Sequence, residues 1–98
     1  MTKYQVVYWR DIPAQVKARL GTIRASRELS PRFQEAIDAA AMQSGAAGTD
    51  EYLAFWRTLD GLSAEGSPES VVDAVAAKLE AEYTDDRLAH LKKAGGTE

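Results

Sequence analysis

The sequence has 98 residues, of which 45% are hydrophobic and 28% charged, and its formal net charge is −3. This size allows one domain, residues 1–98, and the absence of cysteine excludes disulfides, thiolate nucleophiles and thiolate metal sites. No apolar run approaches the roughly 20 residues of a membrane span, and the first ten residues lack the apolar stretch of a secretory signal, so we expect a cytoplasmic protein without a membrane partner.

The first third of the sequence alternates in the manner of β-strands. Residues 3–10 are rich in β-branched and aromatic side chains on both faces, which predicts a strand that is central or covered on both sides. Residues 14–20 and 22–29 alternate in the same way. We therefore expect a small two- or three-stranded antiparallel sheet, with a turn at 10–13 that Pro13 helps to fix.

The rest of the sequence predicts helices. The pairs Ser30-Pro31 and Ser67-Pro68 are typical of an N-cap followed by the first helical residue, and they predict helices over 31–44 and 68–83. Thr49, followed by two acidic residues, caps a further helix. Its apolar residues at helical spacing predict that it runs over 50–60.

The last part of the chain is predicted to change direction. The apolar stripe of the helix over 68–83 does not continue beyond Thr84, so we expect a break there and a short last helix over 85–94. Residues 95–98 are expected to fray. Together, these segments predict an α+β fold with a small sheet followed by three to four helices.

Positive charge is concentrated at the start of the chain. Residues 1–33 carry seven cations and two anions, a net +5, which leaves −8 for the remainder. The cations are Lys3, Arg10, Lys17, Arg19, Arg24, Arg27 and Arg32. The two parts either neutralise each other on folding or form separate faces, of which the positive one would attract an anionic partner.

The sequence shows no catalytic or metal-binding pattern. His90 is the only histidine, and the carboxylates between residues 80 and 86 lack the ligand spacing of a calcium loop. No glycine-rich phosphate loop and no nucleophile elbow is present. We therefore expect no enzyme activity, no metal and no cofactor.

One short segment stands out as a candidate contact site. Aromatic and charged residues stand together beside a turn made rigid by proline, and the predicted partner-binding residues are Tyr8, Trp9, Arg10, Asp11 and Gln15. The alternative is a structural corner, in which Arg10 and Asp11 form an ion pair and Trp9 belongs to the core. Loss of stability, rather than loss of binding, on replacing Arg10 or Asp11 distinguishes the second interpretation from the first.

The segments YWRDIPAQVKAR and RFQEAIDAAAMQSGAAGTDEYLAFWR resemble the small bacterial proteins of the "virulence factor" family. The resemblance covers residues 3–60, and its most specific part is the stretch Trp9 to Gln15. It implies no catalytic residues. With the contact segment, this favours a non-catalytic accessory or protein-interaction module of unknown pathway. We expect its partner to be another protein, or a second copy of the chain in a homodimer.

A weaker local resemblance supports an alternative function. Residues 22–58 resemble ribbon-helix-helix proteins, in which a strand from each chain of a dimer enters the major groove of DNA and outward side chains read bases. The resemblance assigns nucleic-acid binding to Thr22, Arg24 and Ser26, or to Arg24, Ser26 and Glu28 if the register shifts. The chain departs from the pattern because an earlier strand can pair with the ribbon, and its acidic net charge disfavours DNA.

Overall fold

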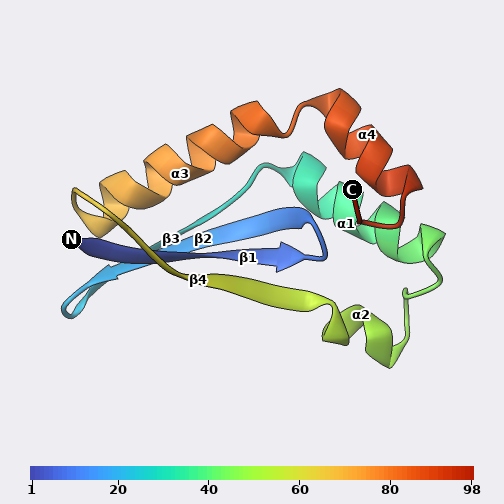
Figure 1. Ribbon diagram of the computed structural model, residues 1–98, viewed down its shortest axis with the longest axis horizontal. Helices are drawn as coiled ribbons and strands as arrows, with labels where there is room; N and C mark the ends of the chain where they lie inside the picture. The colour runs from blue at the N-terminus through green and yellow to red at the C-terminus, as the bar shows by residue number, and fades with distance from the viewer.

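Strand-forming and helix-forming segments assemble into a four-stranded antiparallel sheet and four helices (Figure 1), in a computed structural model that describes residues 1–98. The α+β class predicted from the sequence is confirmed. In chain order the elements are β1 (Thr2–Trp9), β2 (Ile12–Leu20), β3 (Ile23–Glu28), α1 (Pro31–Gln43), α2 (Asp50–Ala54), β4 (Trp56–Ala64), α3 (Pro68–Glu82) and α4 (Asp85–Lys93). None of the helices has the length and apolar character that crossing a membrane requires.

The sheet has the order β3-β2-β1-β4, so β1 has a hydrogen-bonded neighbour on each edge. Its central position agrees with its apolar character on both faces. Val6 of β1 lies opposite Val16 of β2, and both are buried against α3, which lies along one face of the sheet (Figure 1). Ala18 is buried on the same face. The other face of β1, β2 and β3 is not covered by α3.

Residues 56–64 form β4, where the sequence predicted the end of a helix over 50–60 and then a linker. Only Asp50–Ala54 is helical, and Trp56–Ala64 pairs antiparallel with β1. The apolar spacing fits a helix locally, but pairing satisfies a row of backbone groups on β1 that would otherwise remain unpaired. The sheet therefore has four strands instead of two or three.

The turn between β1 and β2 is tighter than predicted. Arg10 and Asp11 alone form it, and Ile12 and Pro13 already belong to β2. Pro13 lies opposite Tyr8 next to a register shift, where a strand tolerates a residue without an N–H group.

The predicted break at Thr84 is confirmed, and it separates α3 from α4. The Thr84 hydroxyl accepts a hydrogen bond from the backbone N–H of Arg87, as an N-cap does, at 3.2 Å. Ser67 caps α3 in the same way. Because α4 turns away at this point, it packs on α1 and not on the sheet.

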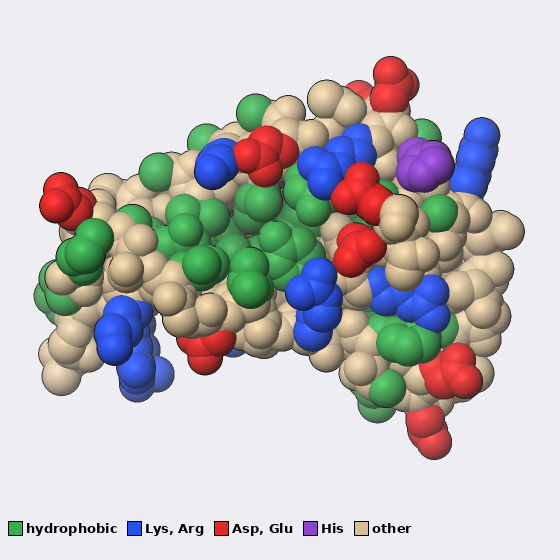
Figure 2. Space-filling model, in the orientation of Figure 1, with side chains coloured by type: hydrophobic (Ala, Val, Ile, Leu, Met, Phe, Trp, Pro, Cys, Tyr) green, Lys and Arg blue, Asp and Glu red, His purple; other side chains and the backbone are tan.

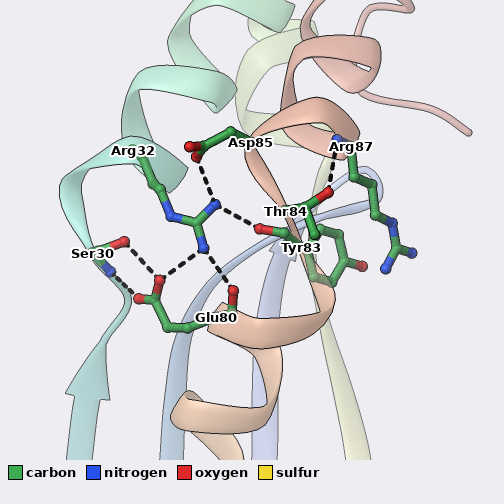
Figure 3. Close-up of polar contacts among 7 residues, drawn as sticks. All are labelled: Ser30, Arg32, Glu80, Tyr83, Thr84, Asp85 and Arg87. Carbon is green, nitrogen blue, oxygen red and sulfur yellow. Dashed lines mark hydrogen bonds and ion pairs between the residues drawn. The ribbon is translucent and has the colours of Figure 1, made fainter.

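A cluster of partly buried polar groups joins the start of α1 to the end of α3 (Figure 3). The Glu80 carboxylate accepts hydrogen bonds from the backbone N–H of Ser30 at 2.6 Å and from its hydroxyl at 2.8 Å. Ser30 thus stands at the predicted N-cap position, but its hydroxyl donates to Glu80 instead of capping α1. The Arg32 guanidinium donates to the Glu80 carboxylate at 3.0 Å and to the carbonyls of Glu80 and Tyr83.

Partial burial raises the pKa of Glu80, but the bonds from Ser30 and Arg32 outweigh it, so the pKa lies below its ordinary value of 4.5. We expect Glu80→Gln to lower the free energy of unfolding by about 1 kcal/mol near neutral pH, because a neutral amide loses charge-assisted bonds. Ionised Glu80 stabilises the fold above its unfolded pKa, and this contribution is lost as the pH falls through the folded pKa.

The difference between the wild type and Glu80→Gln should therefore stay constant down to about pH 4.5 and narrow below it. Urea unfolding followed by tryptophan fluorescence at several pH values measures this. Glu65→Gln, at an exposed carboxylate with no hydrogen-bond partner, is the matched control and should change little. A destabilisation by Glu80→Gln that is the same in acid would show that the charge of Glu80 contributes nothing.

Candidate functional site

Trp9, one of the predicted contact residues, lies in the core and has no exposed surface. It is the last residue of β1, and its indole N–H donates to the carbonyl of Tyr52 at 2.8 Å. The rings of Tyr52 and Phe55 lie 5.8 Å from its ring. The tip of the β1–β2 hairpin is therefore enclosed by α2 and the residues that follow it.

Arg10 covers this aromatic cluster instead of projecting into solvent. Its guanidinium lies 3.8 Å from the centre of the Phe55 ring and donates to the carbonyl of Gly95 at 3.0 Å. Arg10 also has a φ of 52°, in the left-handed region that few residues other than glycine adopt. These contacts offset the strain of that conformation.

Asp11 makes hydrogen bonds to residues 95–98, the segment that the sequence predicted to fray. Its backbone N–H donates to the carbonyl of Gly96 at 2.9 Å, and its carboxylate accepts from the backbone N–H of Glu98 at 2.9 Å. Gly95 and Gly96 are buried. The segment stays ordered because its backbone groups pair with the turn and because Gly96 packs on the ring of Trp9.

Tyr83 completes the contacts of this corner from the end of α3. Its hydroxyl donates to the carbonyl of Asp11 at 3.2 Å, and burial raises its pKa, so the hydroxyl keeps the proton that it donates. Arg57 of β4 donates to the carbonyl of Arg10 at 2.8 Å. The turn therefore holds β4, α3 and residues 95–98 together, which favours the interpretation of a structural corner.

Tyr8 and Gln15, the other predicted contact residues, lie on opposite faces of the sheet and are half-buried. Tyr8 is on the side of α3, where the Arg57 guanidinium lies 4.6 Å from its ring. Figure 2 shows apolar side chains gathered on this side between α3 and β4. Strand pairing puts Tyr4 opposite Leu62, and Val6 opposite the exposed Leu59, on this side of the sheet.

The face of the sheet opposite α3 is positively charged. Strand alternation and register place Lys3, Arg19 and Arg24 in one row across β1, β2 and β3, and Lys17 in the next row. All four side chains are exposed. They line a groove of about 620 Å³ together with Gln5, Ser26 and Asp60. We call the four side chains the cationic face.

The cationic face gathers four cations of one sheet face that have no partner within the chain. None of its four side chains takes part in a salt bridge or a side-chain hydrogen bond, whereas all five arginines elsewhere are bonded within the chain. Arg27 shows the contrast. It is a β3 residue that faces α3, and it pairs with Asp73.

A second hollow continues the groove along the same face, and we call it the apolar recess. It has a volume of about 280 Å³. Its apolar lining consists of Val7, Ala14, Leu29, Pro31, Phe33 and Trp56, and its polar lining of Gln15, Glu28 and Gln34. Because Val7, Gln15 and Glu28 form the row that follows Gln5, Lys17 and Ser26, the recess adjoins the cationic face.

The nucleic-acid alternative assigned roles to residues that the structure places near this face. Arg24 and Ser26 line its groove, and Thr22 is in the turn before β3. β3 pairs with β2 of its own chain and is an edge strand, so its outer edge has no neighbour. Sequence reasoning assigned no site role to Lys3, Lys17 and Arg19. The signal that could have found them is the positive charge of residues 1–33 combined with strand alternation.

The structure brings together no group of three or more His, Asp or Glu side chains that could hold a metal ion. In comparison with known proteins, residues 7–91 match a family model described as Virulence factor. No curated protein and no solved structure matches the chain.

The fit of Gly96 against Trp9 generates a prediction on stability. A Cβ atom at Gly96 would lie 2.8 Å from the Trp9 ring, and the φ of Gly96 is 97°. We expect Gly96→Ala to lower the free energy of unfolding by about 3 kcal/mol through clash and backbone strain together. Gly48→Ala is the control, since Gly48 has a φ of 76° and open space around it, and it should cost about 1 kcal/mol. Equal losses in urea unfolding would contradict close packing of residue 96 on Trp9.

The hydrogen bonds of the corner generate a second prediction. We expect Arg10→Ala to lower the free energy of unfolding by more than about 1.5 kcal/mol, because the part-buried Gly95 carbonyl loses its donor and the Phe55 ring loses its cationic contact. Asp11→Ala should cost about 1 kcal/mol, because the exposed N–H of Glu98 can bond to water instead. Gln15→Ala, from the same predicted set but with a side chain that makes no hydrogen bond, should stay within about 0.5 kcal/mol. If the Arg10 and Asp11 variants also stay within that limit, the corner is not a structural element.

Proposed function

The chain belongs to the virulence factor family, and from this premise we propose that it is a non-catalytic accessory module that binds an acidic partner protein through its cationic face. The sequence predicted a contact surface at Tyr8–Gln15. The proposal moves this surface to the open face of the sheet, because Trp9, Arg10 and Asp11 are engaged within the chain.

One observation carries the proposal, namely four exposed cations on one open face without an intramolecular partner. A charge that is paired within the chain attracts a ligand only weakly, because the opposite charge of its partner cancels most of its field. Unpaired charges of one sign on a common face create a potential that attracts and orients an anionic surface. Asp60 is the single acidic residue in the groove.

The distribution of charge favours an acidic protein over a long nucleic acid. Residues outside 1–33 sum to −8, so a polyanion longer than the groove meets acidic surface beyond it. A protein surface, in contrast, can place a few carboxylates opposite the cations and no negative charge opposite the acidic surface. The apolar recess beside the cationic face also suits a protein partner, since interfaces combine charged rims with apolar contacts.

A second candidate is nucleic-acid binding of the ribbon-helix-helix type, and the unpaired outer edge of β3 favours it. Two copies could pair along this edge, which would bring Arg24 and Ser26 of both copies onto one extended sheet face. This candidate requires a dimer. The acidic-protein proposal does not.

The double variant Arg19→Glu/Arg24→Glu tests the cationic face. We expect wild-type protein to bind fluorescein-labelled polyglutamate in a salt-dependent manner, and the double variant to bind about tenfold more weakly, because two attractive charges become repulsive. Lys92→Glu/Lys93→Glu makes the same change in net charge at the end of α4 and should alter affinity less than about threefold. Urea unfolding of each variant checks that the fold is kept.

Three results would overturn the proposal. Wild-type protein that does not bind polyglutamate has no acidic-segment site. Equal weakening by the two double variants assigns the effect to net charge instead of the cationic face. Much tighter binding of a duplex DNA than of polyglutamate, together with a dimer by light scattering, identifies the second candidate as the function.

A further inference from the structure

We infer that the open face is a two-part site for an extended segment of the partner, which places carboxylates on the cationic face and an apolar side chain in the apolar recess. The inference rests on the proposed function. It specifies the length of the partner segment, the spacing between its carboxylates and its apolar side chain, and the direction in which the segment lies.

The apolar recess is built to take a side chain. Val7 and Trp56 contribute from the central and edge strands, and Phe33 contributes from the first turn of α1. Val7 and Trp56 are half-buried, so part of their apolar surface faces solvent. An apolar side chain that enters the recess removes this surface from water.

The register of the sheet fixes the spacing between the two parts. Lys3, Gln5 and Val7 are alternate residues of β1 on one face, and each begins a row that crosses β2 and β3. Four residues of a strand span roughly 13 Å, and so does an extended peptide. A segment with carboxylates at positions i and i+2 therefore reaches the recess with its side chain at i+4.

Glu28 gives the site a direction. It lies beside the recess, in the row of Val7 and Gln15, and repels a carboxylate there. The acidic end of the segment is therefore expected at the row of Lys3, Arg19 and Arg24.

Peptides of matched composition test the inference. The probe is a fluorescein-labelled peptide with glutamate at its first and third positions, phenylalanine at its fifth and threonine elsewhere. One control replaces the phenylalanine with alanine, and another moves it to the fourth position, where it points away from the sheet. We expect the probe to bind about tenfold more tightly than either control, from burial of one aromatic side chain.

Protein variants separate the two parts of the site. Val7→Thr keeps the shape of the side chain but makes it polar, and it should reduce the preference for phenylalanine over alanine to less than half. Arg19→Glu/Arg24→Glu should weaken all three peptides. Lys92→Glu/Lys93→Glu should change none of them by more than about threefold.

The outcomes distinguish this inference from the proposed function. If polyglutamate binds at Arg19 and Arg24 but the three peptides bind equally, the inference is overturned and the proposed function stands. If the phenylalanine preference survives in Val7→Thr, the recess is not where the side chain lies. If neither polyglutamate nor any peptide binds the wild type, both fail.

Discussion

The enclosure of Trp9 is the interaction on which most of the structure depends. This side chain ends β1 and is fully buried, although it stands next to the turn of a hairpin, where side chains are ordinarily exposed. Elements distant in sequence must therefore cover it. Tyr52 and Phe55 provide aromatic rings, the Arg10 guanidinium lies over the rings of Trp9 and Phe55, and Gly96 packs against Trp9 from the end of the sequence. Because the residues of the corner are engaged within the chain, we look for binding on another surface, and the open face of the sheet carries four unpaired cations together.

The parts of the fold that the sequence predicted correctly are those set by local chemistry. Thr84 caps α4 where the apolar stripe of α3 ends, and β1 is central, as its two apolar faces indicated. The strand β4 was missed because its apolar residues also fit a helical spacing. Its conformation is decided by pairing with β1, which precedes it by about fifty residues and leaves no trace in a local pattern. The contacts of residues 95–98 with Trp9 and Asp11 could not be predicted for the same reason, since they join residues more than eighty positions apart.

Only part of the candidate site could be predicted from the sequence. The excess of cations in residues 1–33 was visible in the sequence, but it was compatible both with a positive face and with neutralisation on folding. Composition does not distinguish a paired arginine from an unpaired one, however. Arg27 faces α3 and meets Asp73, whereas Arg24, three residues earlier, faces the open side and meets no carboxylate. The apolar recess could not be foreseen at all, because it forms where β1, β4 and α1 meet.

The contact between the first hairpin and the last residues also bears on the order in which the chain can fold. The bond from Arg10 to Gly95 spans 85 positions, and that from Glu98 to Asp11 spans 87. A hairpin of consecutive strands forms early, but its tip cannot be sealed until residue 96 has left the ribosome. Until then the indole of Trp9 is only partly covered, so the nascent chain exposes an aromatic side chain that favours aggregation. A fold that is simple in its topology is thus complete only when residues more than eighty positions apart in the sequence meet.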